Sequence, residues 1–224
     1  MDQVINYQRE LDKLIDGFVK EGRVPTLLLH SCCAPCSSYC LEYLARYFHI
    51  TVFYYNPNIS PKEEYERRVL EQQRLIEELE VPHPIGFRLG NYDTERFYSM
   101  AKGLEKEPEG GERCFGCYEL RLREAAIAAK ELDFDYFTTT LSISPHKNAA
   151  KLNEIGLRVG EDYGVSYLPS DFKKKNGYKR SVEMSKEYDL YRQDYCGCVY
   201  SKVEAEARQK AQENSKEGGT NYDM

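Results

Sequence analysis

Hydrophobic residues near the start of the chain recur with the spacing of an α-helix. Leu11, Leu14, Ile15 and Phe18 are separated by one, three or four positions, so one face of a helix would carry all four. Polar residues occupy most of the positions between them. We therefore predict an amphipathic helix over residues 4–20.

Beyond this segment, short apolar runs alternate with longer stretches of helical pattern. Ser60 is predicted to cap one helix, with Pro61 at its first position. The predicted strands cover residues 26–30, 50–55, 85–89 and 134–140, and a short segment at 165–168 precedes a basic loop. The predicted helices cover residues 37–48, 61–80, 118–130, 146–159 and 179–191.

Strands that alternate with helices predict an α/β fold, in which a mainly parallel sheet has helices on both faces. Ligands of such sheets bind beyond the carboxyl ends of the strands. In this sequence those ends carry Cys32, Cys33, Asn56 and residues 139–144. The expected pocket therefore coincides with residues that can do chemistry.

The length of the chain suits a single principal domain. Its 224 residues can bury a sizeable core. We expect an N-terminal helical segment at residues 1–24, a catalytic domain at 25–201 and a charged tail at 202–224. The tail is predicted to be a frayed helix followed by disorder.

Composition and charge restrict the compartment and the partners. The chain is 41% hydrophobic and 30% charged, and its longest apolar run is too short for a membrane helix. Its first residues lack the basic and apolar regions of a signal peptide. We therefore expect a cytoplasmic protein without membrane association, whose thiols stay reduced. The net charge of −6 argues against a general nucleic-acid binder, although a local basic patch is compatible with it.

The eight cysteines carry the strongest chemical signal. Two CxxC pairs, Cys33 with Cys36 and Cys114 with Cys117, each stand just before a predicted helix, where the helix dipole favours thiolates. Two such pairs can supply four ligands to a zinc ion or to an iron–sulfur cluster, and the residue types alone do not choose between these metals. Cys40, one turn beyond Cys36, is predicted to be a core residue.

Cys196 and Cys198 form a third pair, with only Gly197 between them. A disulfide in so small a ring would be strained and easily reduced. The pair therefore suits electron transfer, although it could equally supply metal ligands.

Five stretches of the chain resemble the cobalamin-independent epoxyqueuosine reductase family, which completes queuosine in tRNA. The resemblance runs in one order from Leu28 to Ser201. The stretches are LLHSCCAPC at 28–36, RCFGCYELRL at 113–122, TTTLSISPHK at 138–147, DFKKKNGY at 171–178 and YRQDYCGCVYS at 191–201.

The resemblance implies a fold, a reaction and cofactors. The family fold is a three-layer arrangement similar to the adenine-nucleotide hydrolase-like (HUP-type) enzymes. The implied reaction opens the epoxide of epoxyqueuosine at the wobble position of the anticodon, giving queuosine and water. By resemblance, Cys32, Cys33, Cys114 and Cys117 would hold a 4Fe–4S cluster, and Cys36 could bind a second, mononuclear iron beside it.

The same resemblance implies that Cys196 and Cys198 are redox-active. Removal of the epoxide oxygen as water requires two electrons and protons, so the reaction also needs an electron donor, whose identity the sequence does not give. Asp194 and Tyr195 adjoin the pair and are candidate proton donors. A solvated aspartate and a packed tyrosine are equally compatible with the sequence.

A basic cluster is the candidate surface for tRNA with a modified anticodon wobble base. A run of charge is usually a solvated loop, but here Tyr178 and Phe172 are available to stack on bases. The charged members of this cluster are Lys173, Lys174, Lys175, Lys179 and Arg180.

Three other functions compete with this interpretation. An ATP-dependent tRNA thiolase would need a phosphate-binding loop where residues 31–36 place thiols instead. A thioredoxin-like dithiol enzyme would use the CxxC pair at residues 33–36 and leave most other cysteines without a role. A non-catalytic zinc-binding RNA module would explain the CxxC pairs and the basic loop but not the pair at 196–198.

Overall fold

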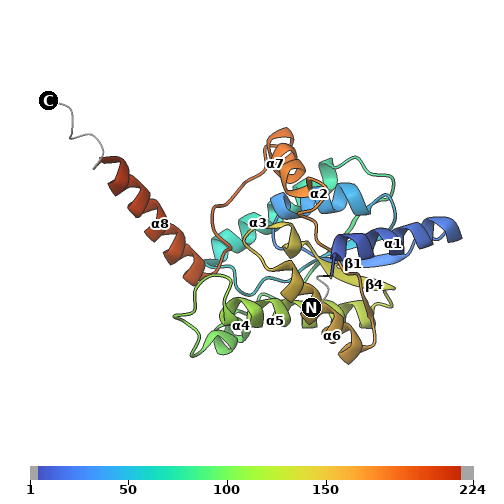
Figure 1. Ribbon diagram of the computed structural model, residues 1–224, viewed down its shortest axis with the longest axis horizontal. Helices are drawn as coiled ribbons and strands as arrows, with labels where there is room; N and C mark the ends of the chain where they lie inside the picture. Colours follow the sequence, from blue (N-terminus) through green and yellow to red (C-terminus); the bar gives the residue numbers. More distant parts are fainter. Residues whose placement is uncertain (1–4, 218–224) are drawn as a thin grey trace.

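The computed structural model describes residues 5–217, which form a three-layer α/β fold around a five-stranded sheet (Figure 1). The strand order is β3-β2-β1-β4-β5, and every neighbouring pair is parallel. The strands are β1 (Thr26–His30), β2 (His49–Tyr54), β3 (Gly86–Leu89), β4 (Tyr136–Thr139) and β5 (Ser166–Tyr167). The helices are α1 (Tyr7–Glu21), α2 (Ala34–Leu44), α3 (Lys62–Glu78), α4 (Thr94–Ala101), α5 (Glu112–Glu131), the 3₁₀ turn η1 (Thr140–Ile143), α6 (Ala149–Tyr163), α7 (Gly177–Glu187) and α8 (Val199–Glu217).

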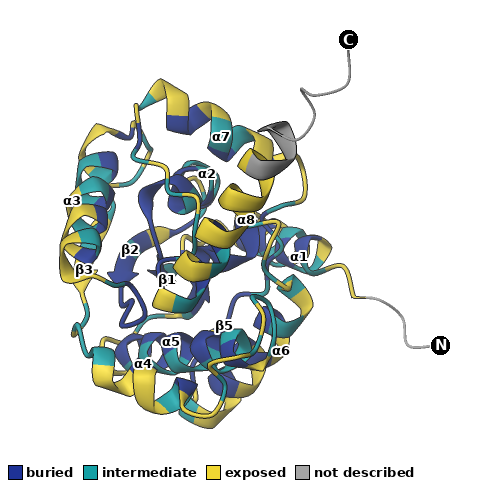
Figure 2. Ribbon diagram, turned by 90° about the vertical axis from the view of Figure 1, so that its left-hand side faces the viewer, coloured by how far each residue is buried: buried dark blue, intermediate teal, exposed yellow. Residues whose placement is uncertain are grey.

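Helices cover both faces of the sheet, as the alternating pattern predicts. Figure 2 shows α2, α3 and α7 on one side of the strands and α4, α5 and α6 on the other. Strand β1 lies in the middle and is buried on both faces: Leu27 and Leu29 belong to one apolar core and Leu28 to the other. Leu11, Ile15 and Phe18 of α1 join the first core, which confirms the predicted apolar face of that helix.

The order in which successive strands are added to the sheet reverses between β1 and β4. Strands β1 to β3 succeed one another toward one edge, and β4 and β5 lie on the other side of β1. His30, at the end of β1, is paired in register with Thr139 at the end of β4. This switch point is where a doubly wound sheet leaves a crevice for ligands.

The structure corrects several helix starts, including those of α2, at Ala34 rather than residue 37, and α6, at Ala149 rather than residue 146. Helix α5 begins at Glu112 rather than near residue 118, so both cysteines of its CxxC pair lie within its first two turns. Buried Arg113 donates to the backbone carbonyls of Leu104, Glu105 and Glu107, in the loop before the helix, and local helix propensity does not reveal these contacts. Helix α3 begins at Lys62, and its N-cap position is Pro61 rather than Ser60.

The charged segment near the end of the chain is helical where the structure describes it. Helix α8 projects from the body of the protein (Figure 1), and its base is tied down by the ion pair of Glu204 with Arg113. The predicted disorder at residues 218–224 lies outside the described residues. None of the helices in residues 5–217 combines the length and apolar character that crossing a membrane requires.

Candidate active site

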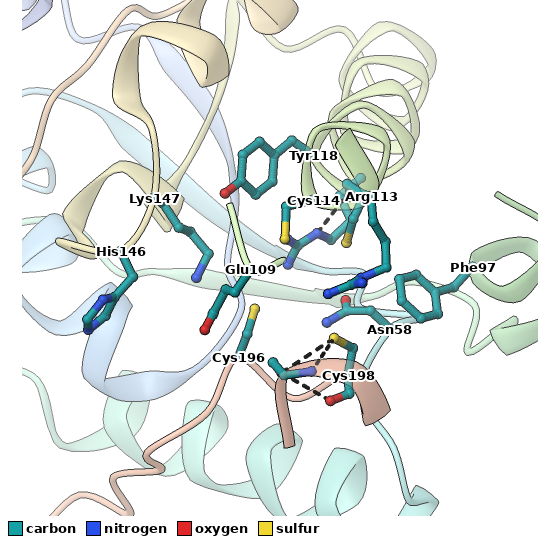
Figure 3. Close-up of a pocket in the computed structure, with 13 residues that line it drawn as sticks. Asn58, Phe97, Glu109, Arg113, Cys114, Tyr118, His146, Lys147, Cys196 and Cys198 are labelled. Atoms are coloured by element: carbon teal, nitrogen blue, oxygen red, sulfur yellow. Dashed lines mark hydrogen bonds between the residues drawn. The ribbon is translucent and has the colours of Figure 1, made fainter. Parts of the chain in front are cut away.

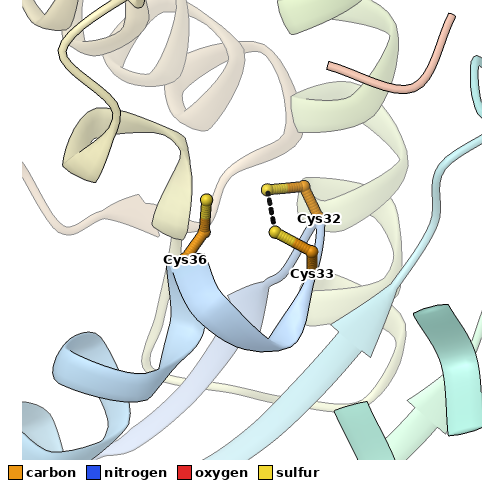
Figure 4. Close-up of side chains that lie close together, drawn as sticks. All are labelled: Cys32, Cys33 and Cys36. Carbon is orange, nitrogen blue, oxygen red and sulfur yellow. Dashed lines mark hydrogen bonds between the residues drawn. The ribbon is translucent and has the colours of Figure 1, made fainter. Parts of the chain in front are cut away.

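Three cysteines gather in the turn between β1 and α2, at the switch point of the sheet. The sulfur atoms of Cys32, Cys33 and Cys36 all lie within 4.8 Å of one another and point toward a common centre (Figure 4). Cys33 occupies the N-cap position of α2. Cys32 Sγ lies 3.8 Å from Cys33 Sγ and 3.9 Å from Thr140 Oγ1, across the switch point. The spacing and chemistry of this set are those of a metal-binding group.

The surroundings of these cysteines favour a thiolate at Cys32. Hydrogen bonds from the thiols of Cys33 and Cys36 to its sulfur hold the pKa of Cys32 well below the usual value, and the positive charges of Lys147 and Arg121 act in the same direction. The same hydrogen bond to Cys32 raises the pKa of Cys33 to about 12. The turn therefore presents one thiolate supported by thiol donors, and a bound cation would deprotonate the others.

Four further cysteines surround a narrow cavity next to this turn. Figure 3 shows Cys114 of α5 facing Cys196 and Cys198, which precede α8. Cys117 also lines the cavity and packs with Cys198 in a small apolar cluster. Burial raises the pKa of Cys117 to about 12. Fully buried thiols of this kind stay protonated until a metal or a positive charge compensates them.

Cys196 connects the two groups of cysteines. It lines the narrow cavity and also a larger cleft of about 500 Å³, whose wall includes Cys32, Cys33 and Cys36. Lys147 lines this cleft as well. The fold thus brings seven of the eight cysteines to one place. The eighth, Cys40, is fully buried in the apolar core, as predicted.

The segment that carries Cys196 and Cys198 is held from one side by α3. Arg68, whose side chain is 2% exposed, pairs with Glu64 at 2.6 Å and donates a hydrogen bond to the carbonyl of Cys196 at 3.2 Å. The N–H group of Ser60 donates to the carbonyl of Gly197 at 3.0 Å. Gly197 has a φ of +117°, a conformation that side chains rarely allow.

The two candidate proton donors both line the large cleft but differ in environment. Asp194 is exposed, and its carboxylate accepts a hydrogen bond from Gln209 of α8 at 2.6 Å. Tyr195 is half-buried below the guanidinium of Arg68, and burial raises the pKa of its hydroxyl, so this group carries its proton at neutral pH.

The predicted tRNA-binding residues separate into three kinds. Tyr178 lies at the large cleft, 38% exposed, with the guanidinium of Arg192 5.8 Å from the centre of its ring. Lys174 is exposed and has no ion pair with any residue in the described range. The remaining four are engaged within the protein: Lys173 donates to the carbonyls of Ser142 and Lys147, Lys175 pairs with Asp12, Lys179 with Glu183, and Arg180 with Glu42 and Glu187.

Phe172 corrects one expectation about stacking. Its ring is fully buried in the apolar core under α2, so it cannot stack on a base without unfolding of the loop. The sequence gives only the apolar character of this residue, which suits a core position and a surface stacking position equally well.

Several residues of the site were not singled out from the sequence. Arg68, Arg121, Lys147 and Glu109 all line one of the two cavities. Arg121 follows Cys117 by four positions in the same helix, a spacing that could have suggested that it lies beside the thiols. Arg68 pairs locally with Glu64, four positions earlier, but nothing local indicates its contact with Cys196, 128 positions away, or the contact of Glu109 with Glu204, 95 positions away.

Comparison with known proteins gives one family. Residues 27–204 match the sequence model of the family described as "Epoxyqueuosine reductase QueH". This range contains all eight cysteines.

Relatives with that name share much of the chain. The protein from Streptococcus pyogenes serotype M1 is 48% identical over 202 residues, which cover 89% of this chain and 79% of the relative. The protein from Staphylococcus epidermidis is 46% identical over 204 residues, covering 89% and 86%. The protein from Thermotoga maritima is 36% identical over 200 residues, covering 87% and 98%.

Proposed function

The chain belongs to the epoxyqueuosine reductase QueH family, and on this premise we propose how its site performs the reaction. The protein is an enzyme of queuosine biosynthesis that reduces the epoxide of epoxyqueuosine at the tRNA wobble position to give queuosine. The observation that best supports the chemistry is the meeting of seven thiols from three segments at the switch point of the sheet. A cytoplasmic location remains our prediction.

The electrons and protons that the reaction consumes match those that Cys196 and Cys198 can release. Loss of the epoxide oxygen as water consumes two electrons and two protons and leaves a carbon–carbon double bond. Oxidation of the thiols of Cys196 and Cys198 to a disulfide releases two electrons and two protons. Cys196 faces the large cleft, where a nucleoside can enter, while Cys198 is buried behind it. We propose that this pair is the immediate source of the electrons, and that an external donor reduces it again.

We further propose a metal centre at the remaining thiols. The donor set fits such a group, because it consists of soft thiols in two adjoining cavities with the positive charges of Lys147 and Arg121 nearby. Cys32, Cys33, Cys114 and Cys117 would hold a 4Fe–4S cluster, and Cys36 a second iron. Such a cluster supplies electrons one at a time when bound.

The protein's own residues would orient the substrate and supply protons. Tyr178 stands at the cleft with an exposed ring on which the modified base can stack. Tyr195 keeps its proton at neutral pH and lies next to Cys196, so we propose it ahead of the exposed Asp194 as the proton donor to the leaving oxygen.

The tRNA itself would approach along the basic cluster at residues 173–180. The exposed ammonium group of Lys174 can bind a phosphate group directly. Lys175 and Arg180 would first have to release the carboxylates of Asp12 and Glu42. Lys173 would support this surface from below by holding the loop.

Metal content and activity test the proposal together. Anaerobically purified protein should contain about four acid-labile sulfides and about five irons per chain, four in the cluster and one at Cys36, and should absorb visible light. It should then convert epoxyqueuosine in tRNA to queuosine with dithionite as the reductant. Cys40→Ser is a matched control, because this thiol lies in the core outside both cavities. Colourless protein that contains zinc and no sulfide, even after reconstitution, would overturn the redox mechanism and favour a zinc-binding RNA module.

A further inference from the structure

Arg121 is a buried arginine that lies between the two groups of cysteines. Its side chain is 1% exposed and lines the narrow cavity together with Cys114, Cys117 and Cys196. The Nε atom donates to the carbonyl of Cys117 at 3.3 Å, and Nη1 donates to Oδ1 of Asn56 at 3.3 Å. The Nη2 atom is buried and has no hydrogen-bond partner in the described part of the chain.

Among the residues that the structure describes, no carboxylate pairs with Arg121 to balance its charge. The two other fully buried arginines of the described chain each have one: Arg68 pairs with Glu64 and Arg113 with Glu204. Within residues 5–217, the hydrogen bonds of Arg121 go only to neutral oxygen atoms. A buried cation without a counter-charge is strongly destabilising, so this environment must provide negative charge in another form.

The neighbouring thiols are the available source of that charge. Burial alone would lower the pKa of Arg121, whereas the thiolate forms of Cys117, Cys196 and Cys32 would raise it. These three thiols come from three different segments of the chain. The arginine therefore faces every segment that contributes to the cysteine centre.

Arg121 is also connected mechanically to the turn that carries Cys32. Asn56, fully buried at the end of β2, accepts from Arg121 and donates from Nδ2 to the carbonyl of Ser31 at 2.8 Å. Ser31 immediately precedes Cys32. The bonds from Arg121 through Asn56 to Ser31 thus fix the distance between helix α5 and the β1–α2 turn.

We propose that Arg121 is the counter-ion and positioning residue of the cysteine centre, and that its charge sets the reduction potential of that centre. This inference rests on the proposed metal centre. One-electron reduction adds one negative charge and neither forms nor breaks a bond, so a fixed positive charge nearby favours the reduced state. Removal of the charge should lower the potential.

The test is a redox titration with dithionite, followed by electron paramagnetic resonance, on reconstituted full-length protein. For Arg121→Gln we expect at least a tenfold fall in the equilibrium constant for one-electron reduction, which corresponds to 59 mV. Arg121→Lys should recover most of the shift because it keeps the charge. Arg123→Gln, on the outer side of the same helix and paired with Glu119, is the control and should match the wild type.

A second variant and a zinc-binding measurement distinguish failure of this inference from failure of the proposed function. Because loss of a buried arginine can prevent folding, Asn56→Asp provides a second variant: it places a carboxylate against Arg121 and should also lower the potential. Unchanged potentials in loaded Arg121→Gln or Asn56→Asp would overturn the inference. If the wild type binds zinc but no sulfide, the proposed function fails on its own. Zinc should then bind at least tenfold more weakly to Arg121→Gln than to Arg123→Gln, and equal affinities would overturn the role of Arg121 as well.

Discussion

Substitution of Gly197 by alanine should displace Cys196 and Cys198, the proposed redox pair, without unfolding the protein. A Cβ atom at this position would lie 2.9 Å from Nη1 of Arg68 and 2.9 Å from Cγ1 of Ile59. Neither neighbour can retreat easily, since Arg68 is held by Glu64 and Ile59 is 1% exposed. The φ of +117° adds backbone strain.

The magnitude follows from comparing two responses to the added methyl group. If the loop stayed in place, strain at this φ would cost about 1–3 kcal/mol and the overpacked contacts a further 1–3 kcal/mol or so. If the loop moved, it would lose its hydrogen bonds from Ser60 and Arg68, worth about 0.5–1.5 kcal/mol each. Movement is the less costly response. We therefore expect a loss of about 1–3 kcal/mol, or a decrease in Tm of roughly 2–12 °C for a domain of this size.

The assay measures reduction of epoxyqueuosine in tRNA under single-turnover conditions, with melting temperature and iron content measured on the same preparation. Gly197→Ala should keep its iron and lose at least tenfold in rate, because Cys196 no longer faces the cleft in the same position. Gly103→Ala is the matched control: its φ is +85°, and an added Cβ meets nothing within 4 Å. Wild-type rate and melting temperature in Gly197→Ala would refute the reasoning.

Three other perturbations separate the parts of the site. Cys32→Ser should lose bound iron, measured by metal analysis, while Cys40→Ser keeps it; equal iron in both would remove Cys32 from the ligand set. Lys174→Glu should weaken tRNA binding and reduce the salt dependence of its Kd by roughly one phosphate contact, and an unchanged slope would exclude this lysine from the interface. Asp135→Asn should cost about 1 kcal/mol in urea unfolding at pH 7, a modest value because the side chain is 37% exposed. Hydrogen bonds from the start of β1 lower the pKa of Asp135, so its contribution should persist down to the ordinary aspartate pKa and disappear as the pH falls through the lower folded-state value; a difference that is independent of pH would contradict this assignment.

The layered fold could be predicted because it depends on local periodicity. The apolar run of β1 and the helical spacing of Leu11, Ile15 and Phe18 both record which faces are buried. The start of α5 could not be predicted in this way. Its first turns contain Cys114, a glycine and a second cysteine, which are weak helix formers, and their helical conformation depends on tertiary contacts.

The sequence predicted which cysteines form the site, but it did not predict the ion pairs of the charged residues around it. Thiol spacing is local information, and it identified all seven cysteines that meet at the switch point. The state of a charged residue depends instead on distant partners. Lys175 pairs with Asp12, 163 positions away, and Arg180 with Glu42, 138 positions away, so a basic cluster in the sequence is largely neutralised on folding.

The three cysteine segments also restrict the time at which the centre can be assembled. They are separated by gaps of roughly 80 residues, and the last segment lies near the end of the chain. During synthesis the ribosome must therefore release all three segments before their thiols can meet. A fragment that stops before residue 112 would lack two of the four thiols that are proposed to hold the cluster. The complete proposed centre would accordingly be loaded only after the strands on both sides of the switch point have been synthesised.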